Sequence, residues 1–184
     1  IEQGGIDPTA FCFELTESDA VANIGKAENL MRRLRKLGCG VALDDFGTGL
    51  SSLSYLRSLP ATLLKIDGSF VRDILKDPRA ESMVQAIAQL SRTMSIATVA
   101  EYVETLEIQA RLVSLGVDYA QGFAVGRPQP LTALLEELPL LCSAMVVPAD
   151  ASASARHARL EADRVGVDGQ YGKTAAVASG MLHR

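Results

Sequence analysis

"GVALDDFGTGLSSL", residues 40–53, decides the fold because it joins a short apolar run to an acidic pair and a turn. Residues 40–46 have the length and apolar content of a strand buried on both faces, as in a parallel sheet. Asp44 and Asp45 stand side by side near the end of this expected strand. The turn that follows contains Gly47, Thr48 and Gly49.

The adjacent aspartates raise an electrostatic problem. Two carboxylates about 4 Å apart repel by about 4 kcal/mol at an effective dielectric constant of about 20. A bound cation removes this repulsion, and without one the pair must share a proton or move apart. Oxygen ligands without histidine suit Mg2+ or Mn2+ and disfavour zinc. The structural alternative is a helix N-cap with a solvated neighbour, followed by glycines that only shape a turn.

Similar apolar runs occur on both sides of this segment. They predict further strands at residues 10–16, 62–67, 95–101 and 118–123. Amphipathic stretches predict helices at residues 19–37, 79–94 and 105–115. Repeated strand–helix units of about 25 residues indicate a parallel α/β fold.

Polar side chains stand at the carboxyl end of each expected strand. They are Glu14, Asp44 with Asp45, Lys65 with Asp67, Glu101, and Gln121. A barrel collects its site from many strand ends, whereas an open doubly wound sheet has its site at one switch point. The sequence therefore predicts an incomplete (β/α)8 TIM-type barrel with about five of its strand–helix units.

Several of the polar residues also have a structural interpretation. Lys65 and Asp67 could form an ion pair, and Gln121 could cap a strand. Glu17 and Glu104 each open an expected helix, where the helix dipole favours a negative charge. The prediction of a metal site therefore depends on all of them meeting at one rim.

Composition limits the remaining function classes. The chain has 184 residues, 48% of them hydrophobic, and a net charge of −4. We expect a globular protein that binds no DNA, since no basic stripe is present, and no membrane segment, since apolar runs are too short. Three scattered cysteines favour a reducing cytoplasm. Both histidines, His157 and His183, fall in an Ala/Ser/Gly-rich stretch, so we expect a metal-activated water and no covalent nucleophile.

Five motifs, in order, resemble those of the EAL domain, a family of bacterial phosphodiesterases that linearise cyclic di-GMP to pGpG. They are "FELTES" (13–18), "DDFGTGLSSL" (44–53), "LKIDGSFV" (64–71), "AEYVET" (100–105) and "AQGFAVGRP" (120–128). The resemblance implies that residues 1–138 form the C-terminal part of an EAL domain. Residues 139–184 are expected to be a poorly ordered tail.

The resemblance also implies roles for the strand-end residues in a barrel enzyme with two Mg2+ or Mn2+ ions. Glu14, Asp44, Asp45 and Glu101 look like metal ligands, with Asp44 between the two ions. Lys65 and Glu101 look like catalytic residues. Lys65 resembles the lysine that orients the hydrolytic water, and Glu101 resembles the glutamate that acts as general base. The expected substrate or supporting contacts are Gln121, Glu17, Asp67 and Glu104, with Gly47, Thr48 and Gly49 forming the loop that Glu17 holds.

The sequence also departs from the family pattern. The Glu-Ala-Leu signature and a metal-binding asparagine have no counterpart here, and Tyr102 stands where the family commonly has glycine. A cyclic di-GMP receptor or protein-interaction module without hydrolysis therefore stays open, as does a chain that does not fold by itself. A homodimer and an upstream sensory or diguanylate cyclase domain are further partners that the resemblance leaves open.

Overall fold

The computed structural model describes residues 7–48, 54–130, 132–133 and 182–183. The chain divides into two compact units, residues 1–126 with 173–184 and residues 127–172. The described part of the second unit is residues 127–130 and 132–133, of which the last two are helical. The predicted boundary at residue 138 and almost all of the predicted tail lie outside the described residues, so both stay predictions.

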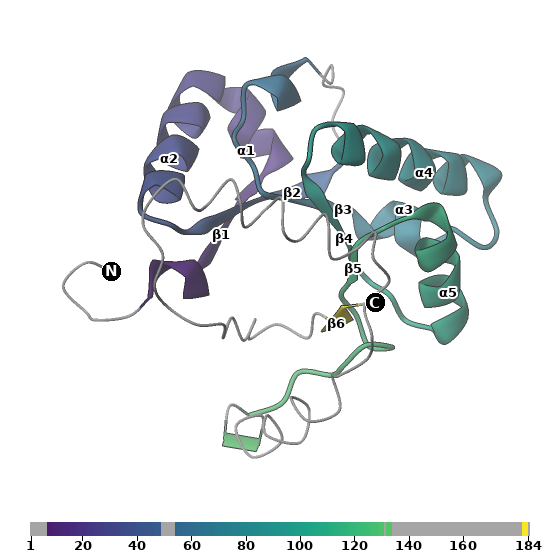
Figure 1. Ribbon diagram of the computed structural model, residues 1–184. Coiled ribbons are helices and arrows are strands. Elements are labelled where there is room, and N and C mark those ends of the chain that lie inside the picture. The colour runs from purple at the N-terminus through teal and green to yellow at the C-terminus, as the bar shows by residue number, and fades with distance from the viewer. Residues whose placement is uncertain (1–6, 49–53, 131, 134–181, 184) are drawn as a thin grey trace. The chain divides into compact units, whose positions relative to one another are not determined.

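The first unit is built on one sheet (Figure 1). Its strands are β1 (Cys12–Thr16), β2 (Gly40–Phe46), β3 (Leu63–Ile66), β4 (Ala97–Ala100), β5 (Tyr119–Ala120) and β6 (Leu182–His183). Strands β1 to β5 are parallel and follow one another in sequence order, whereas β6 is antiparallel to β5. A sheet whose order runs on from β1 to β5 is part of a barrel wall, because a doubly wound sheet reverses its order at a switch point.

Helices connect the parallel strands. They are η1 (Pro8–Ala10), α1 (Glu17–Ala22), α2 (Ile24–Lys36), η2 (Tyr55–Arg57), α3 (Gly68–Arg72), α4 (Pro78–Thr93) and α5 (Leu106–Leu115). Figure 1 shows α1, α2, α4 and α5 along the outer side of the row of strands. Helices α4 and α5 lie within a residue of their predicted bounds. Asp77 caps α4, and Gly116, with φ of 85°, ends α5.

The prediction of a single helix over residues 19–37 is wrong. Asn23 has an extended φ of −152° and separates α1 from α2. Its side chain accepts a hydrogen bond of 3.0 Å from the Lys26 N–H, which caps the start of α2. Within α2, Met31 is buried while Leu30 is exposed.

Strand β3 separates the core from the site by simple alternation. Leu64 and Ile66 are fully buried in the core shared with the helices. Lys65, between them, points to the opposite face because successive strand side chains alternate. Val99 of β4 pairs with Lys65, so it lies on the same face as Lys65, where it is fully buried. The helix side of the sheet carries the core cluster that includes Leu64 and Ile66, and the other side also holds polar groups.

One polar contact at the amino end of β4 joins that strand to the start of β5. The Asp118 carboxylate accepts hydrogen bonds from the Thr98 backbone N–H (3.0 Å) and hydroxyl (2.9 Å). The Asp118 N–H donates in return to the Thr98 hydroxyl oxygen (3.1 Å). Thr98 is fully buried, so both of its donors depend on this carboxylate.

Asp118→Ala should therefore lower the free energy of unfolding by about 1–3 kcal/mol, the usual cost of a buried donor left unpaired. Urea denaturation followed by circular dichroism measures this loss. Asp118→Asn keeps an acceptor oxygen and should lose less. An Asp118→Ala midpoint equal to that of the wild type would contradict the assignment.

Candidate metal centre

The Lys65 ammonium is shared by three carboxylates from different strand ends. Its Nζ lies 2.8 Å from Glu101 Oε1, 2.9 Å from Glu14 Oε2 and 3.0 Å from Asp44 Oδ1. The Lys65 side chain is only 5% exposed. Glu14, Asp44 and Lys65 belong to β1, β2 and β3, and Glu101 directly follows β4. Parallel strands in sequence order bring their carboxyl ends to one rim, which is why these four residues meet.

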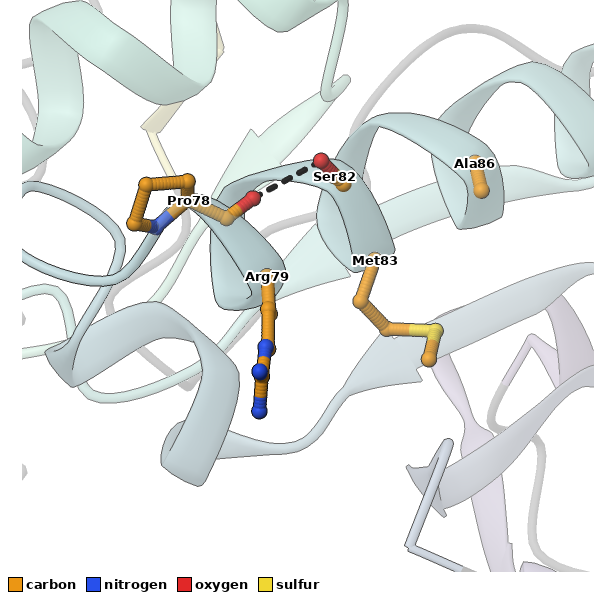
Figure 2. Close-up of a pocket in the computed structure, with 5 residues that line it drawn as sticks. All are labelled: Pro78, Arg79, Ser82, Met83 and Ala86. Atoms are coloured by element: carbon orange, nitrogen blue, oxygen red, sulfur yellow. Dashed lines mark hydrogen bonds between the residues drawn. The ribbon is translucent and has the colours of Figure 1, made fainter.

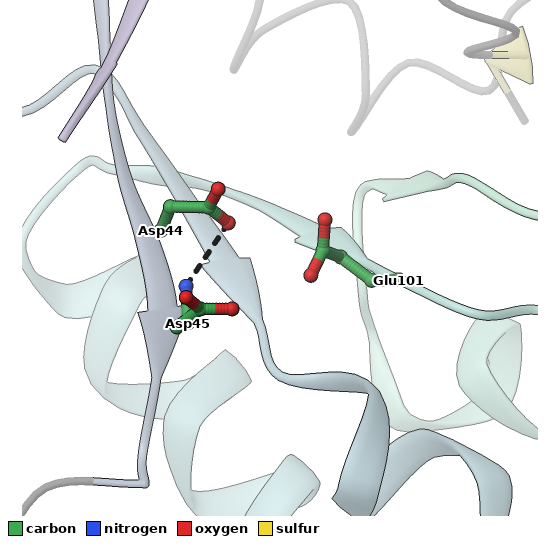
Figure 3. A group of neighbouring side chains, drawn as sticks. All are labelled: Asp44, Asp45 and Glu101. Atoms are coloured by element: carbon green, nitrogen blue, oxygen red, sulfur yellow. Dashed lines mark hydrogen bonds between the residues drawn. The ribbon is translucent and has the colours of Figure 1, made fainter. Parts of the chain in front are cut away.

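Asp44, Asp45 and Glu101 form the acidic side of the same cluster. One carboxylate oxygen from each lies within 4.8 Å of the others. Figure 3 shows the two aspartates projecting from β2 and Glu101 pointing toward them from the segment after β4. We name Glu14, Asp44, Asp45, Lys65 and Glu101 together the strand-end cluster.

The backbone explains how two adjacent aspartates face one site. Asp45 has φ of 54°, in the left-handed region, and the pairing register of β2 with β3 shifts between Leu43 and Phe46. Such a bulge re-aims a side chain that would otherwise point to the opposite face. The Asp45 N–H donates to Asp44 Oδ1 (3.0 Å), which ties the two residues together.

The pKa shifts follow from burial and from surplus negative charge. Burial acts to lower the pKa of Lys65, but its hydrogen bonds to Glu101, Glu14 and Asp44 outweigh burial and raise it. Lys65 is therefore a fully charged ammonium at neutral pH. Burial raises the pKa of Glu101 despite its bond to Lys65, and Asp44 and Asp45 raise it further. Desolvation, then Asp44 and Asp67, raise the pKa of Asp45.

The donor set of the cluster fits a hard divalent cation. Four carboxylates face one ammonium, which leaves a formal charge of about −3 at neutral pH. Carboxylate oxygens are the ligands that Mg2+, Mn2+ and Ca2+ prefer. Glu14, Asp44, Asp45 and Glu101 could each supply one.

Glu17 lies near this cluster but serves the loop after β2. It is 3% exposed, and its Oε2 accepts a hydrogen bond of 2.9 Å from the Gly47 N–H. Its Oε1 accepts from the Tyr55 hydroxyl. A Cβ at residue 47, where φ is 103°, would lie 2.9 Å from the Phe70 ring. The Thr48 hydroxyl donates to the Asp45 carbonyl (3.0 Å), while Gly49 lies outside the described residues.

The remaining predicted residues divide into near and distant ones. Gln121 follows β5, and its Oε1 is buried without a hydrogen-bond partner among the described residues. Asp67 caps α3 through the Ser69 N–H (2.9 Å) and acts electrostatically on Asp45. Glu104 is exposed, and no contact found in the described part of the chain joins it to the cluster. Its role stays a prediction.

Two features were not predicted from the sequence. Tyr55 anchors Glu17 from 38 residues away, and no local pattern signals such a contact. Tyr102, directly after Glu101, lies against Gly68 of α3.

A shallow pocket on the exposed face of α4 is separate from this chemistry (Figure 2). Its lining is Pro78, Arg79, Ser82, Met83 and Ala86. None of these side chains is acidic.

Fold and site together define a parallel α/β domain of barrel type with a carboxylate-rich centre at the carboxyl ends of its strands. The chain belongs to the EAL domain family, whose model matches residues 1–128.

Relatives with curated names support this membership. The chain is 48% identical over 126 residues to the cyclic di-GMP phosphodiesterase PdeB of Shewanella oneidensis, covering 68% of this chain and 15% of that protein. It is 44% identical over 133 residues to the cyclic di-GMP phosphodiesterase PdeF of Escherichia coli K12, covering 72% and 18%. The chain thus spans less than a fifth of the length of these relatives.

Solved structures show the same fold. The PaMucR phosphodiesterase in its c-di-GMP complex has a TM-score of 0.69 and 40% identity, over 72% of this chain and 54% of that one. A manganese and cyclic di-GMP complex of BlrP1 from Klebsiella pneumoniae has a TM-score of 0.63 and 34% identity, over 67% and 32%. These likenesses confirm the predicted TIM-type α/β fold.

No helix in the described ranges is long and apolar enough to cross a bilayer. Cys12 is exposed and Cys39 is buried.

Asp45→Asn should stabilise the metal-free chain at neutral pH. The native pKa of Asp45 is raised, so native ionisation costs stability above its ordinary pKa of 3.8, and asparagine does not ionise. In thermal unfolding with EDTA, the variant should have a higher melting temperature than the wild type at pH 7. This difference should disappear near pH 3. A variant that melts lower than the wild type at pH 7 would contradict the raised pKa of Asp45.

Tyr55→Phe should cost about 1.5–3 kcal/mol, because the buried Glu17 carboxylate loses a hydrogen-bond donor. Burial, then the bond to Glu17, raise the pKa of Tyr55 above its ordinary value of 10.0, so this contribution is full below pH 10 and shrinks above it. Urea titrations at pH 8 and pH 11 compare the two regimes. Equal losses at both pH values would show that the hydroxyl contact is not the cause.

Proposed function

We propose that this chain carries the strand-end site of a phosphodiesterase that hydrolyses cyclic di-GMP to pGpG. The observation that carries the proposal is the convergence of Glu14, Asp44 and Glu101 on Lys65, with Asp45 beside them. Relatives at more than 40% identity are named cyclic di-GMP phosphodiesterases. Similar solved domains hold cyclic di-GMP, in one case with manganese.

In this proposal, Glu14, Asp44, Asp45 and Glu101 hold two Mg2+ or Mn2+ ions. Divalent ions at such a site activate water and stabilise the charge that develops on phosphoryl oxygens. Water oxygen forms a bond to one phosphorus while the bond from that phosphorus to the ribose 3′ oxygen breaks, which opens the ring to linear pGpG.

The chain's own side chains then have separate tasks. Lys65 keeps its proton at neutral pH, so it acts as a donor that orients oxygen atoms and is not a general base. The Glu101 carboxylate, whose pKa is raised, takes up the proton of the attacking water. Gln121 Oε1 is buried without a partner among the described residues and is available to a substrate donor.

The setting of this activity is also a proposal. We expect the substrate cyclic di-GMP to be met in the cytoplasm, with no DNA contact. Glu17 would hold the Gly47 loop and transmit changes from a homodimer contact. One relative, MucR of Pseudomonas aeruginosa, is named a bifunctional diguanylate cyclase and phosphodiesterase at 42% identity, which favours an upstream domain of that type or a sensory domain.

Cyclic di-GMP binding without hydrolysis is the second candidate. The observation that favours it is that Lys65 already neutralises part of the cluster, since it contacts three of the four carboxylates. Calorimetry with cyclic di-GMP separates the two functions, because a receptor binds tightly and forms no pGpG.

Asp44→Ala should lower the rate of pGpG formation about 100-fold or more, because it removes a carboxylate at the centre of the cluster. The assay uses cyclic di-GMP with Mn2+, on this chain and on any longer product of the same coding sequence. Asp73→Asn removes one exposed carboxylate charge at the residue after α3 and is the matched control.

If Asp44→Ala forms pGpG at the wild-type rate, the assignment of the strand-end cluster as the catalytic site is wrong. If every wild-type preparation binds cyclic di-GMP tightly and forms no pGpG, the receptor function is supported and the enzymatic function is wrong.

A further inference from the structure

Tyr102 has a strained backbone beside the strand-end cluster. Its φ is 52°, in the left-handed region that side chains larger than glycine rarely adopt. The Glu101 N–H donates to the Ile66 carbonyl of β3 (3.3 Å), and the Val103 N–H donates to the Gln121 carbonyl after β5 (3.0 Å). Tyr102 thus lies between two residues anchored to different strands, and such strain persists only where surrounding contacts hold it.

The Tyr102 ring is held on α3. It packs against Gly68 so closely that any Cβ at residue 68 would overlap its carbons. The Arg72 guanidinium carbon lies 4.1 Å from the ring centroid, a cation–π contact. Gly68 and Arg72 are four residues apart on α3 and therefore share one helix face.

We propose that Tyr102, Gly68 and Arg72 form a latch that positions the Glu101 carboxylate. The latch joins the segment that carries Glu101 to α3, and α3 begins two residues after β3, which carries Lys65. Tyr102 is a positioning residue, since it acts through Glu101 and has no contact of its own with the cluster among those found. The latch stands on this geometry, whereas its consequence for metal binding rests on the proposed function.

Such support has a role at Glu101 because its neighbours repel it. Its carboxylate lies within 4.8 Å of oxygens of Asp44 and Asp45, and Lys65 is the cation that it contacts. The latch acts in addition to the Glu101 and Val103 backbone hydrogen bonds, and it opposes an outward turn of the segment that would relieve this repulsion. With the latch in place, the segment after β4 stays on α3 and Glu101 stays within 2.8 Å of Lys65.

Four variants of the full chain test the latch. Tyr102→Gly removes the ring and also its strain, because glycine accepts positive φ. Tyr102→Phe keeps the ring on Gly68 and under Arg72. Gly68→Ala pushes the ring away, and the double variant Gly68→Ala/Tyr102→Gly removes the clash together with the ring.

Two readouts are taken, amide hydrogen exchange of Glu101 and Val103 by NMR and calorimetric affinity for Mn2+ alone. Tyr102→Gly should speed both amides and weaken Mn2+ binding about tenfold, the usual effect of losing a group that supports a metal ligand. Tyr102→Phe should recover most of that loss. Gly68→Ala should resemble Tyr102→Gly, and the double variant should be no worse than Tyr102→Gly.

Unchanged exchange and affinity in Tyr102→Gly would overturn the latch, and so would effects of Gly68→Ala and Tyr102→Gly that add in the double variant. Asp44→Ala separates this result from the proposed function. If Asp44→Ala leaves Mn2+ affinity unchanged, or the wild type binds no Mn2+, the metal site is wrong and the exchange rates alone decide the latch.

Discussion

The ammonium of Lys65 is the interaction on which the whole site depends. Carboxylates from β1, from β2 and from the residue after β4 approach it within 3.0 Å. Each pair of such carboxylates repels by about 4 kcal/mol when about 4 Å apart at an effective dielectric constant of about 20. The sheet forces this proximity because parallel strands in sequence order bring their carboxyl ends to one rim. Lys65 makes it tolerable, and the buried side chains on the other face of β3 hold Lys65 in place.

Two of the three non-glycine residues with positive φ in the described part of the chain border the strand-end cluster. Asp45 and Tyr102 each stand next to a residue that binds Lys65, whereas the third, Ser95, lies before β4. Non-glycine residues with positive φ cost about 1–3 kcal/mol each and persist only when the rest of the structure determines them. Here the bulge in β2 determines Asp45 and the contacts with α3 determine Tyr102. This strain lowers the free energy of unfolding, and the packing of the core offsets it, as expected where function and stability compete.

The sequence predicted the strand ends well because their signals are local. A short apolar run followed by a lysine or a carboxylate marks a buried parallel strand that reaches a polar rim, and Lys65 and Glu101 follow that rule. Glu14 also lies at the rim, but β1 is largely exposed and Glu14 is its middle residue. The break at Asn23 was missed because a helix-forming pattern continues across it and only the cap decides. The bond between Glu17 and Tyr55 could not be predicted, since it joins residues 38 positions apart and no local pattern links them.

If the proposed function holds, the formal charges of the cluster would favour two divalent ions over one when a phosphodiester binds. Four carboxylates and one ammonium carry about −3, so a single divalent ion leaves the site negative and repels an anionic phosphate. A second divalent ion makes the site positive by one charge, and one phosphodiester anion then brings the total to zero. The positive charge of Lys65 is what permits this balance, because four carboxylates alone would leave the total at about −1. Because Lys65 already gathers Glu14, Asp44 and Glu101, little rearrangement of the carboxylates is needed when the cations arrive, and preorganised charge of this kind is the usual source of catalytic electrostatics.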